Sequence, residues 1–136
     1  MTRFLTSALL ATTLPLLAES PIKPGTELTL IFDEFELADG PSWDGWSLTI
    51  PDPLAQQTKR LTVSKGEWHD QFKDKRFSAS YCNHGHHYFA DNGNGAIVKR
   101  DYLTKEFEVI HQEDLEADKT RKPNDLVVDL SLILIS

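Results

Sequence analysis

Short strand-like runs separated by turn residues recur along this chain, and they constrain its fold more than any other feature. The runs are rich in Thr, Val, Ile, Tyr, Phe and Trp, and Asp-Gly, Gly-Pro, Asn-Gly and Lys-Gly dipeptides lie between them. No segment of helical length has apolar residues at helical spacing; the nearest, 113–119, is polar and is better interpreted as a loop. We therefore predict an all-β fold, with strands at 27–32, 46–50, 59–63, 77–81, 87–90, 96–100, 107–110 and 126–130.

Two parts of the chain have a similar build. Residues 43–68 and 83–109 each have the order strand, turn, strand, polar turn and third strand. Strand spacing alone is compatible with a sandwich, a barrel or propeller blades. Repetition at about 40 residues favours a β-propeller, in which each blade is a small antiparallel sheet.

The N-terminus has the layout of a secretory signal peptide. A positive residue, Arg3, precedes the apolar stretch 4–17, and Ala18 is a suitable cleavage residue. The stretch is short for a membrane span, and a buried helix is disfavoured because no polar face occurs at helical spacing. We predict a signal peptide at 1–18, a lead-in at 19–26 and one domain at 27–136. The mature protein would then be periplasmic or secreted, without a membrane anchor.

Cysteine count and charge limit how the protein is held together and what it binds. Cys82 is the single cysteine, so an internal disulfide is impossible and packing alone must stabilise the domain. The chain has 14 Lys and Arg against 21 Asp and Glu, with no basic stripe that would suit a phosphate backbone. Nucleic acid is therefore not an expected partner.

Three segments resemble the gluconolactonase/regucalcin-like lactonase family. They are Ala-Asp-Gly-Pro-Ser-Trp-Asp-Gly at 38–45, the Asp-ending strands within 88–101, and Lys-Pro-Asn-Asp-Leu-Val-Val-Asp at 122–129. They occur in the family's order and at about its spacing. The resemblance implies that residues 27–136 form two to three blades of a six-bladed β-propeller, about the first third of a family member. It also implies an exported hydrolase that acts on a sugar lactone.

The resemblance further implies a divalent cation, usually Ca²⁺, held by a first-blade Glu, two Asn and a late Asp, a set of oxygen ligands that suits a hard cation. Asp39 takes the position of the Glu with one methylene less, Asn124 matches the first Asn, and Asp125 would lie beside the metal or substrate. The second Asn and the late Asp, assigned in the family as the base that activates water, have no counterpart. Without the resemblance, both Asp39 and Asn124 would be interpreted as turn residues.

The chain thus predicts an incomplete and inactive lactonase, with no catalytic residue of its own. Its end supports the same interpretation, because the apolar run 130–135 lacks the turn and partner strand that a blade requires. The alternative is a non-enzymatic secreted β domain that binds carbohydrate or a protein partner.

His84-Gly85-His86-His87 suggests a different chemistry. On a strand His84 and His86 would share a face, and with Cys82 or His69 they could begin a Zn²⁺ or Cu²⁺ site. The spacing matches no standard ligand set, so a polar turn entering a strand is the preferred interpretation, and a His-based metal carrier is a minor option.

Eight aromatic residues could form a platform for sugar rings, but at alternating strand positions they are predicted to be core between blades. They are Trp43, Trp46, Trp68, Phe77, Tyr81, Tyr88, Phe89 and Phe107.

Overall fold

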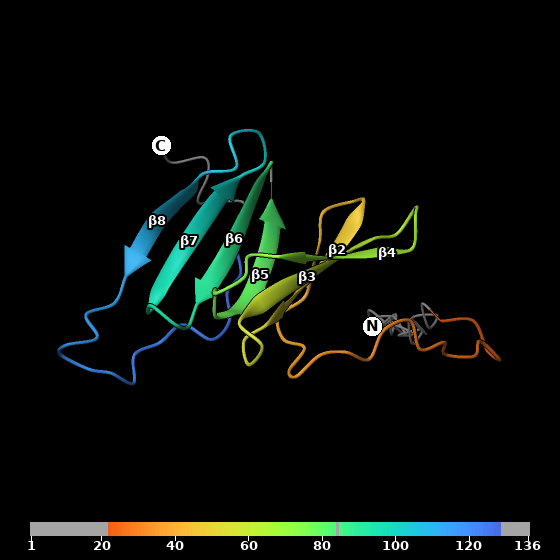
Figure 1. Ribbon diagram of the computed structural model, residues 1–136, viewed down its shortest axis with the longest axis horizontal. Helices are drawn as coiled ribbons and strands as arrows, with labels where there is room; N and C mark the ends of the chain where they lie inside the picture. Colours follow the sequence, from red (N-terminus) through yellow and green to blue (C-terminus); the bar gives the residue numbers. More distant parts are fainter. Residues whose placement is uncertain (1–21, 84, 129–136) are drawn as a thin grey trace, which may run out of the picture. The chain divides into compact units, whose positions relative to one another are not determined.

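The computed structural model describes residues 22–83 and 85–128, and the regular structure of these residues is β-strand (Figure 1). The all-β fold class is confirmed. The chain divides into two compact units, Met1–Phe32 and Asp33–Ser136, and the strands all lie in the second. None of the described segments is a helix with the length and apolarity needed to cross a bilayer. The predicted signal peptide and the apolar run 130–135 fall outside the described residues.

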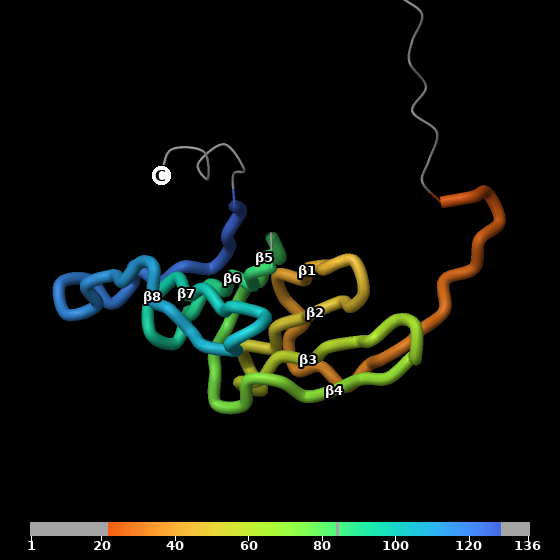
Figure 2. Tube along the Cα trace, turned by 90° about the horizontal axis from the view of Figure 1, so that it is seen from above, coloured from red at the N-terminus to blue at the C-terminus, as the bar shows by residue number. Residues whose placement is uncertain are grey.

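Two four-stranded antiparallel sheets make up the second unit (Figures 1 and 2). The first sheet has the order β1-β2-β3-β4, with β1 at Ser42–Trp43, β2 at Ser47–Asp52, β3 at Gln57–Thr62 and β4 at Glu67–Gln71. The second has the order β5-β6-β7-β8, with β5 at Phe77–Asn83, β6 at His86–Asp91, β7 at Ala96–Asp101 and β8 at Phe107–Gln112. Each strand pairs with the next one along the chain, so both sheets are simple meanders.

The two sheets follow one plan with an offset of 39 residues. Asp52 ends β2 and Asp91 ends β6, and a four-residue turn leads from each to the next strand. Both turns close on a residue with positive φ, Gln56 at 51° and Gly95 at 67°. The structure therefore contains the repeat predicted from the sequence.

The apolar core lies on one face of the second sheet. It consists of Phe77, Phe89, Ala96 and Val98, with Phe72 from the connection between the sheets packed against them. The Phe77 and Phe89 rings stack with centroids 4.4 Å apart. Burying each of these rings contributes roughly 2 kcal/mol to stability. In β8, by contrast, all six residues are exposed.

Polar groups join the two sheets. The Ser80 amide donates to the Gly40 carbonyl at 2.8 Å, and the Ser42 and Ser80 hydroxyls are 2.7 Å apart. Ser42, Ser80 and their neighbour His87 are all buried. The first strands of the two sheets are thus connected by hydrogen bonds in a buried seam.

Several predicted strands differ from the structure. Residues 27–32 form no strand, because Leu28 and Leu30 are exposed to solvent and no described strand pairs with this segment. The part of 126–130 that is described, 126–128, is likewise not a strand. Strand β1 was not predicted, because it has only two residues. Strand β4 was predicted only as the third strand that begins at the end of 43–68, because it is too polar to show strand-like alternation. The remaining six match within a few residues, and 113–119 is a loop as predicted.

The prediction that all eight aromatic residues are core is partly wrong. Phe77 and Phe89 are buried, whereas Trp43, Trp46 and Phe107 are exposed by 51%, 79% and 41%. Trp43 and Phe107 lie on strands at the two ends of the strand orders, and Trp46 lies in a turn. The Phe107 ring lies 5.4 Å from that of Phe72 and is therefore only partly covered. Strand alternation identifies the face of a side chain, but it does not show whether another layer covers that face.

Candidate functional site

Gly40 lies directly against the start of β5. A Cβ atom at Gly40 would be 2.3 Å from the Cα of Ala79 and 2.8 Å from the carbonyl oxygen of Ser78. Its φ is also positive, at 40°. Only glycine permits this approach, so the Asp-Gly-Pro sequence brings the preceding Asp39 to the first residues of β5.

Asp39 is half-buried and held from both sides of its backbone. Its amide donates to the Pro51 carbonyl at 3.1 Å, and its Oδ1 accepts from the Gly40 amide at 2.9 Å. Among the described residues no donor lies at the other carboxylate oxygen, Oδ2. Asp39 therefore forms the turn expected from its sequence while retaining an oxygen that could face a cation.

The segment containing Asn124 reaches the same end of β5. The Ser78 hydroxyl donates to the Pro123 carbonyl at 3.2 Å, and the Asn92 side-chain amide donates to the same carbonyl at 3.3 Å. Asn124 and Asp125 follow directly and are exposed. Ser78 thus contacts Gly40 through its backbone and Pro123 through its side chain, which brings residues 39–40 and 123–125 together.

Ser78 and Asn92 were not identified from the sequence. Asn92 lies in the Asp-Asn-Gly-Asn-Gly run, which indicates a turn but not its contact with a segment 31 residues away. Ser78 lies at the register shift between Phe77 and Ala79, an irregularity that strand alternation does not reveal.

The two described histidines of the His-Gly-His-His segment point to opposite faces of β6. The Nε2 atom of His87 lies 3.1 Å from the Ser42 hydroxyl, and its ring is 4.2 Å from that of Phe89. Burial lowers the pKa of His87 to about 3, so the ring is neutral at pH 7. His86 instead lies 3.4 Å from an Asp101 carboxylate oxygen.

A metal site built on these histidines has little support. His84 lies outside the described residues, and His69 is on β4, 3.7 Å from the Glu67 carboxylate. Cys82 contacts Ser42 at 3.4 Å, in the same seam as His87, and burial raises the pKa of its thiol. Within the described ranges, no three His, Cys, Asp or Glu side chains are grouped as a metal ion would require.

The Ser42–His87 pair resembles a nucleophile beside its base, but its environment does not suit that chemistry. Both side chains are buried, and a general base is most effective when its pKa lies near the working pH. With a pKa of about 3, His87 is a weak base. We interpret the pair as part of the seam that joins the sheets.

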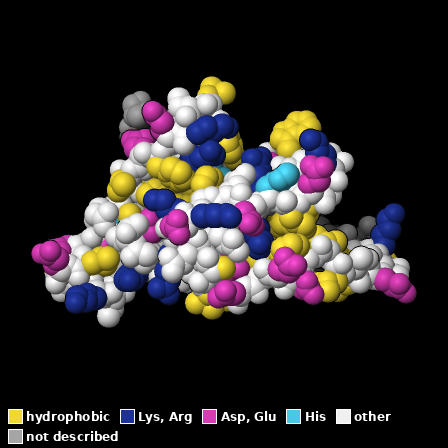
Figure 3. Space-filling view, in the orientation of Figure 1, with side chains coloured by type: hydrophobic (Ala, Val, Ile, Leu, Met, Phe, Trp, Pro, Cys, Tyr) yellow, Lys and Arg dark blue, Asp and Glu magenta, His cyan; other side chains and the backbone are white. Residues whose placement is uncertain are grey.

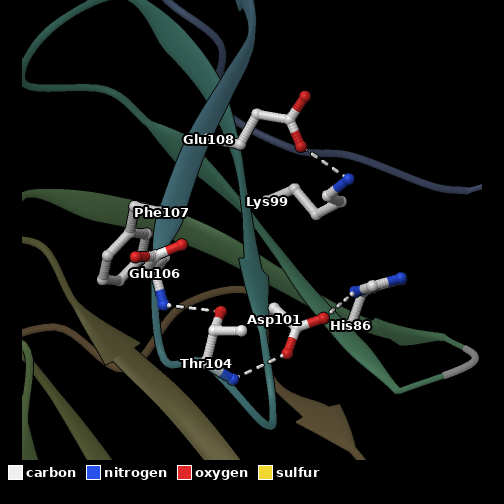
Figure 4. Close-up of a pocket in the computed structure, with 7 residues that line it drawn as sticks. All are labelled: His86, Lys99, Asp101, Thr104, Glu106, Phe107 and Glu108. Atoms are coloured by element: carbon white, nitrogen blue, oxygen red, sulfur yellow. Dashed lines mark hydrogen bonds and ion pairs between the residues drawn. The ribbon is translucent and has the colours of Figure 1, made fainter.

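A pocket beside His86 is lined by charges that already have partners (Figure 4). Lys99 contacts Glu108 at 2.6 Å across β7 and β8, while Asp101 approaches His86. The backbone amides of Thr104 and Leu103 hold the pKa of Asp101 below its usual value. These ion pairs are typical of an exposed sheet face and indicate no particular ligand.

The geometry therefore favours one candidate site. It is the end of β5 at which residues 39–40 and 123–125 meet. No protein-family model matches the chain, and a search of curated proteins finds no significant match.

Proposed function

We propose that the two sheets are blades of a β-propeller of the class that hydrolyses sugar lactones with the help of a divalent cation, and that this chain has an incomplete site and is itself inactive. The fold part of this proposal is supported by the repeated four-stranded meander and by the hydrogen bonds that join β1 to β5. In a propeller, the corresponding strands of successive blades lie side by side around an axis. The sequence resemblance supplies the reaction class, and the predicted signal peptide supplies export of the mature protein.

The observation that carries the proposal is that the residues next to the two ligand positions, Gly40 and Pro123, both lie at Ser78. Asp39 and Asn124 are 85 positions apart in the sequence, yet Gly40 and Pro123 both contact this residue. A carboxylate and an amide oxygen are suitable ligands for Ca²⁺. Bound there, the cation would polarise the lactone carbonyl, and Asp125 would lie close enough to contact the substrate.

Two ligand positions do not satisfy the six to eight oxygens that Ca²⁺ takes, so we expect weak binding by this chain. Because the second Asn and the late Asp have no counterpart in the sequence, we also expect no lactone hydrolysis above the spontaneous rate. Replacing Asp39 with Glu should strengthen calcium binding, because the Glu side chain extends one methylene further.

Calcium titration followed by NMR of the full chain, with the amide signals of residues 39–40 and 124–125 as reporters, tests the proposal. We expect Asp39→Glu to bind more tightly than the natural chain and Asn124→Ala to bind at least about threefold more weakly. Asp33→Asn removes an exposed carboxylate of the same unit and serves as the matched control. Equal calcium affinity in all four proteins would remove the basis of the proposal.

Hydrolysis of glucono-1,5-lactone, measured with and without a chelator, tests the reaction separately. The expected result is a rate equal to that of buffer alone. Calcium-dependent turnover that Asn124→Ala abolishes would support the lactonase class, but would show that the chain contains a base we have not identified.

A further inference from the structure

A second pocket lies at the other end of β5. It has a volume of about 430 Å³ and is formed by the turns and strand ends of both sheets. The first sheet contributes Asp44, Trp46 and Arg60, and the second contributes Gly85, Tyr102 and Lys105. Since Gly85 follows β5 while Ser78 lies near its start, this pocket is separate from the candidate cation site.

Trp46 is the most exposed tryptophan described and forms one wall of this pocket. Its backbone is fixed because the Asp44 carboxylate accepts from the amides of Trp46 and Ser47 at 2.9 and 2.7 Å. An exposed indole on a fixed turn offers a flat apolar surface of the kind that stacks against the C–H face of a sugar ring. Nothing in the packing of the second unit explains its position.

The charge around the pocket is more positive than the chain as a whole. Arg60 pairs with Asp44 at 2.7 Å, whereas no carboxylate of the described residues lies within ion-pair distance of Arg100. Arg100 lies on β7, two residues before Tyr102 in the sequence, and its guanidinium lies over the Phe72 ring at 4.9 Å; it is not among the residues that line the pocket. Burial and the nearby Arg60 guanidinium lower the pKa of Arg100.

The excess of positive charge around this pocket differs from the mixture of charges on the face shown in Figure 3. The chain has a net charge of −7, and on the face shown in Figure 3 acidic and basic side chains are interspersed. Among the residues that line the pocket, however, Arg60 and Lys105 are cationic and Asp44 is the one carboxylate, and Arg100 lies close enough to Arg60 for their charges to interact. The Nε atoms of both arginines are also buried without a hydrogen-bond acceptor in the described structure. Buried donors of this kind normally have an acceptor, and a bound anion would supply one.

We propose that this pocket binds a small sugar that carries one carboxylate, with the ring on Trp46 and the carboxylate toward Arg60 and Lys105. Guanidinium groups bind carboxylates through paired hydrogen bonds, which gives both strength and orientation. Asp44 favours a singly charged ligand with hydroxyl donors, because its carboxylate would repel a phosphate dianion. The proposal does not depend on lactone hydrolysis or on a cation.

Titration of the isotope-labelled full chain with D-glucuronate, D-glucose and inorganic phosphate tests this site by NMR. Glucuronate and glucose differ in the carboxylate alone, so the comparison isolates the contribution of Arg60 and Lys105. We expect saturable glucuronate binding that shifts the Trp46 indole signal, with glucose and phosphate each at least about tenfold weaker.

Variants identify the groups responsible. Trp46→Ala should weaken glucuronate binding about tenfold, while Trp43→Ala, which removes another exposed tryptophan outside the pocket, should not change it. Lys105→Ala should reduce the preference for glucuronate over glucose. Asn124→Ala should have no effect, which separates this site from the proposed cation site.

Three results would overturn the inference. The first is equal binding of glucose and glucuronate, since Arg60 and Lys105 would then have no role. The second is unchanged glucuronate affinity in Trp46→Ala. The third is phosphate binding as tight as that of glucuronate, which would indicate a simple anion site without sugar recognition.

Discussion

At the scale of single residues, two positions determine how the sheets meet. Gly40 allows the first sheet to approach β5, and His87 lies in the seam between Ser42 and Phe89. Both effects depend on close packing with residues far away in the sequence. Their consequences for stability can be measured with single substitutions.

Gly40→Ala should destabilise the protein strongly. The added methyl group would lie 2.3 Å from the Cα of Ala79, a backbone atom that cannot move without shifting β5. We expect the free energy of unfolding to fall by at least about 2 kcal/mol, measured by urea denaturation. Gly66→Ala is the matched control, because Gly66 has a φ of 67° but no atom within 4 Å of the added methyl.

The control isolates the clash from the backbone cost. Gly66→Ala should lose only about 1 kcal/mol, the usual cost of placing a Cβ in the left-handed region. Equal losses in the two variants would mean that contact with Ala79 is not tight in solution.

His87 should make the protein less stable as the pH falls below 6.5. Burial lowers its pKa to about 3 in the folded state, whereas the ordinary value of 6.5 applies when the chain unfolds. Between these values the unfolded state binds the extra proton, so acidification favours unfolding. From pH 7.5 to pH 5 this contribution removes about 2 kcal/mol from the free energy of unfolding.

Urea titrations of the natural chain and of His87→Gln at both pH values measure this contribution. The free energy of unfolding of the variant should change less between the two pH values, by about 2 kcal/mol. At pH 7.5 the variant should be less stable than the natural chain, because it loses the packing of the His87 ring. His69→Gln replaces a histidine that is about half exposed and should keep the pH sensitivity of the natural chain. If His87→Gln keeps it as well, His87 is not buried in its neutral form.

At the scale of elements, the two sheets repeat a turn that follows an Asp, but the two Asp residues make different contacts. Asp52 is fully buried and accepts from the amides of Glu36, Leu37 and Ala55 at 2.9 to 3.1 Å. Asp91 accepts from the amide and side chain of Asn94, within its own turn. The first turn thus also fixes the segment before β1.

Replacing each Asp with Ala should therefore have unequal effects. Asp52→Ala leaves three backbone amides without an acceptor, and we expect a loss of about 3 kcal/mol or more in the free energy of unfolding. Asp91→Ala is the structurally equivalent control and should lose about half as much. Urea denaturation of both variants provides the comparison; a larger loss for Asp91→Ala would contradict the hydrogen bonding described for Asp52.

The same repeat explains which elements could be predicted. Six strands were found because their Thr, Val, Ile and aromatic residues alternate between turn signals, a local pattern. Strand β1 was missed because two residues cannot show alternation, and 27–32 was predicted wrongly because its apolar residues have no partner strand. Pairing is a tertiary contact, and local sequence does not contain it.

At the scale of the whole molecule, the candidate sites depended on contacts that sequence spacing does not give. The resemblance selected Asp39 and Asn124, but the approach of their neighbours Gly40 and Pro123 to Ser78 is visible only in the fold. The pocket at Trp46 was not predicted, because its residues come from separate turns of two sheets. In the sequence, Trp46 was indistinguishable from a core tryptophan.

The two sheets should unfold as one cooperative unit, because hydrogen bonds of Ser42 and Gly40 with Ser80 join them and the main apolar cluster lies on the second sheet. The sequence provides a reporter for each sheet. The three tryptophans lie in the first sheet or its turn, and the single cysteine, Cys82, lies on β5 in the second. Tryptophan fluorescence and pulsed labelling of the Cys82 thiol, measured across one urea gradient, should give the same midpoint.

Ser80→Ala should separate the two midpoints. It removes the hydroxyl that contacts Ser42 and donates to the Gly40 carbonyl, so the first sheet loses part of its attachment to the core of the second. The fluorescence midpoint should then fall below the labelling midpoint, whereas Ser64→Ala, an exposed turn substitution, should leave them together. Midpoints that already differ in the natural chain would show that the seam does not couple the sheets.

Coupling of this kind is what allows residues from both sheets to form the two candidate sites, since each site needs groups from β1 or its turns and from β5 or its neighbours.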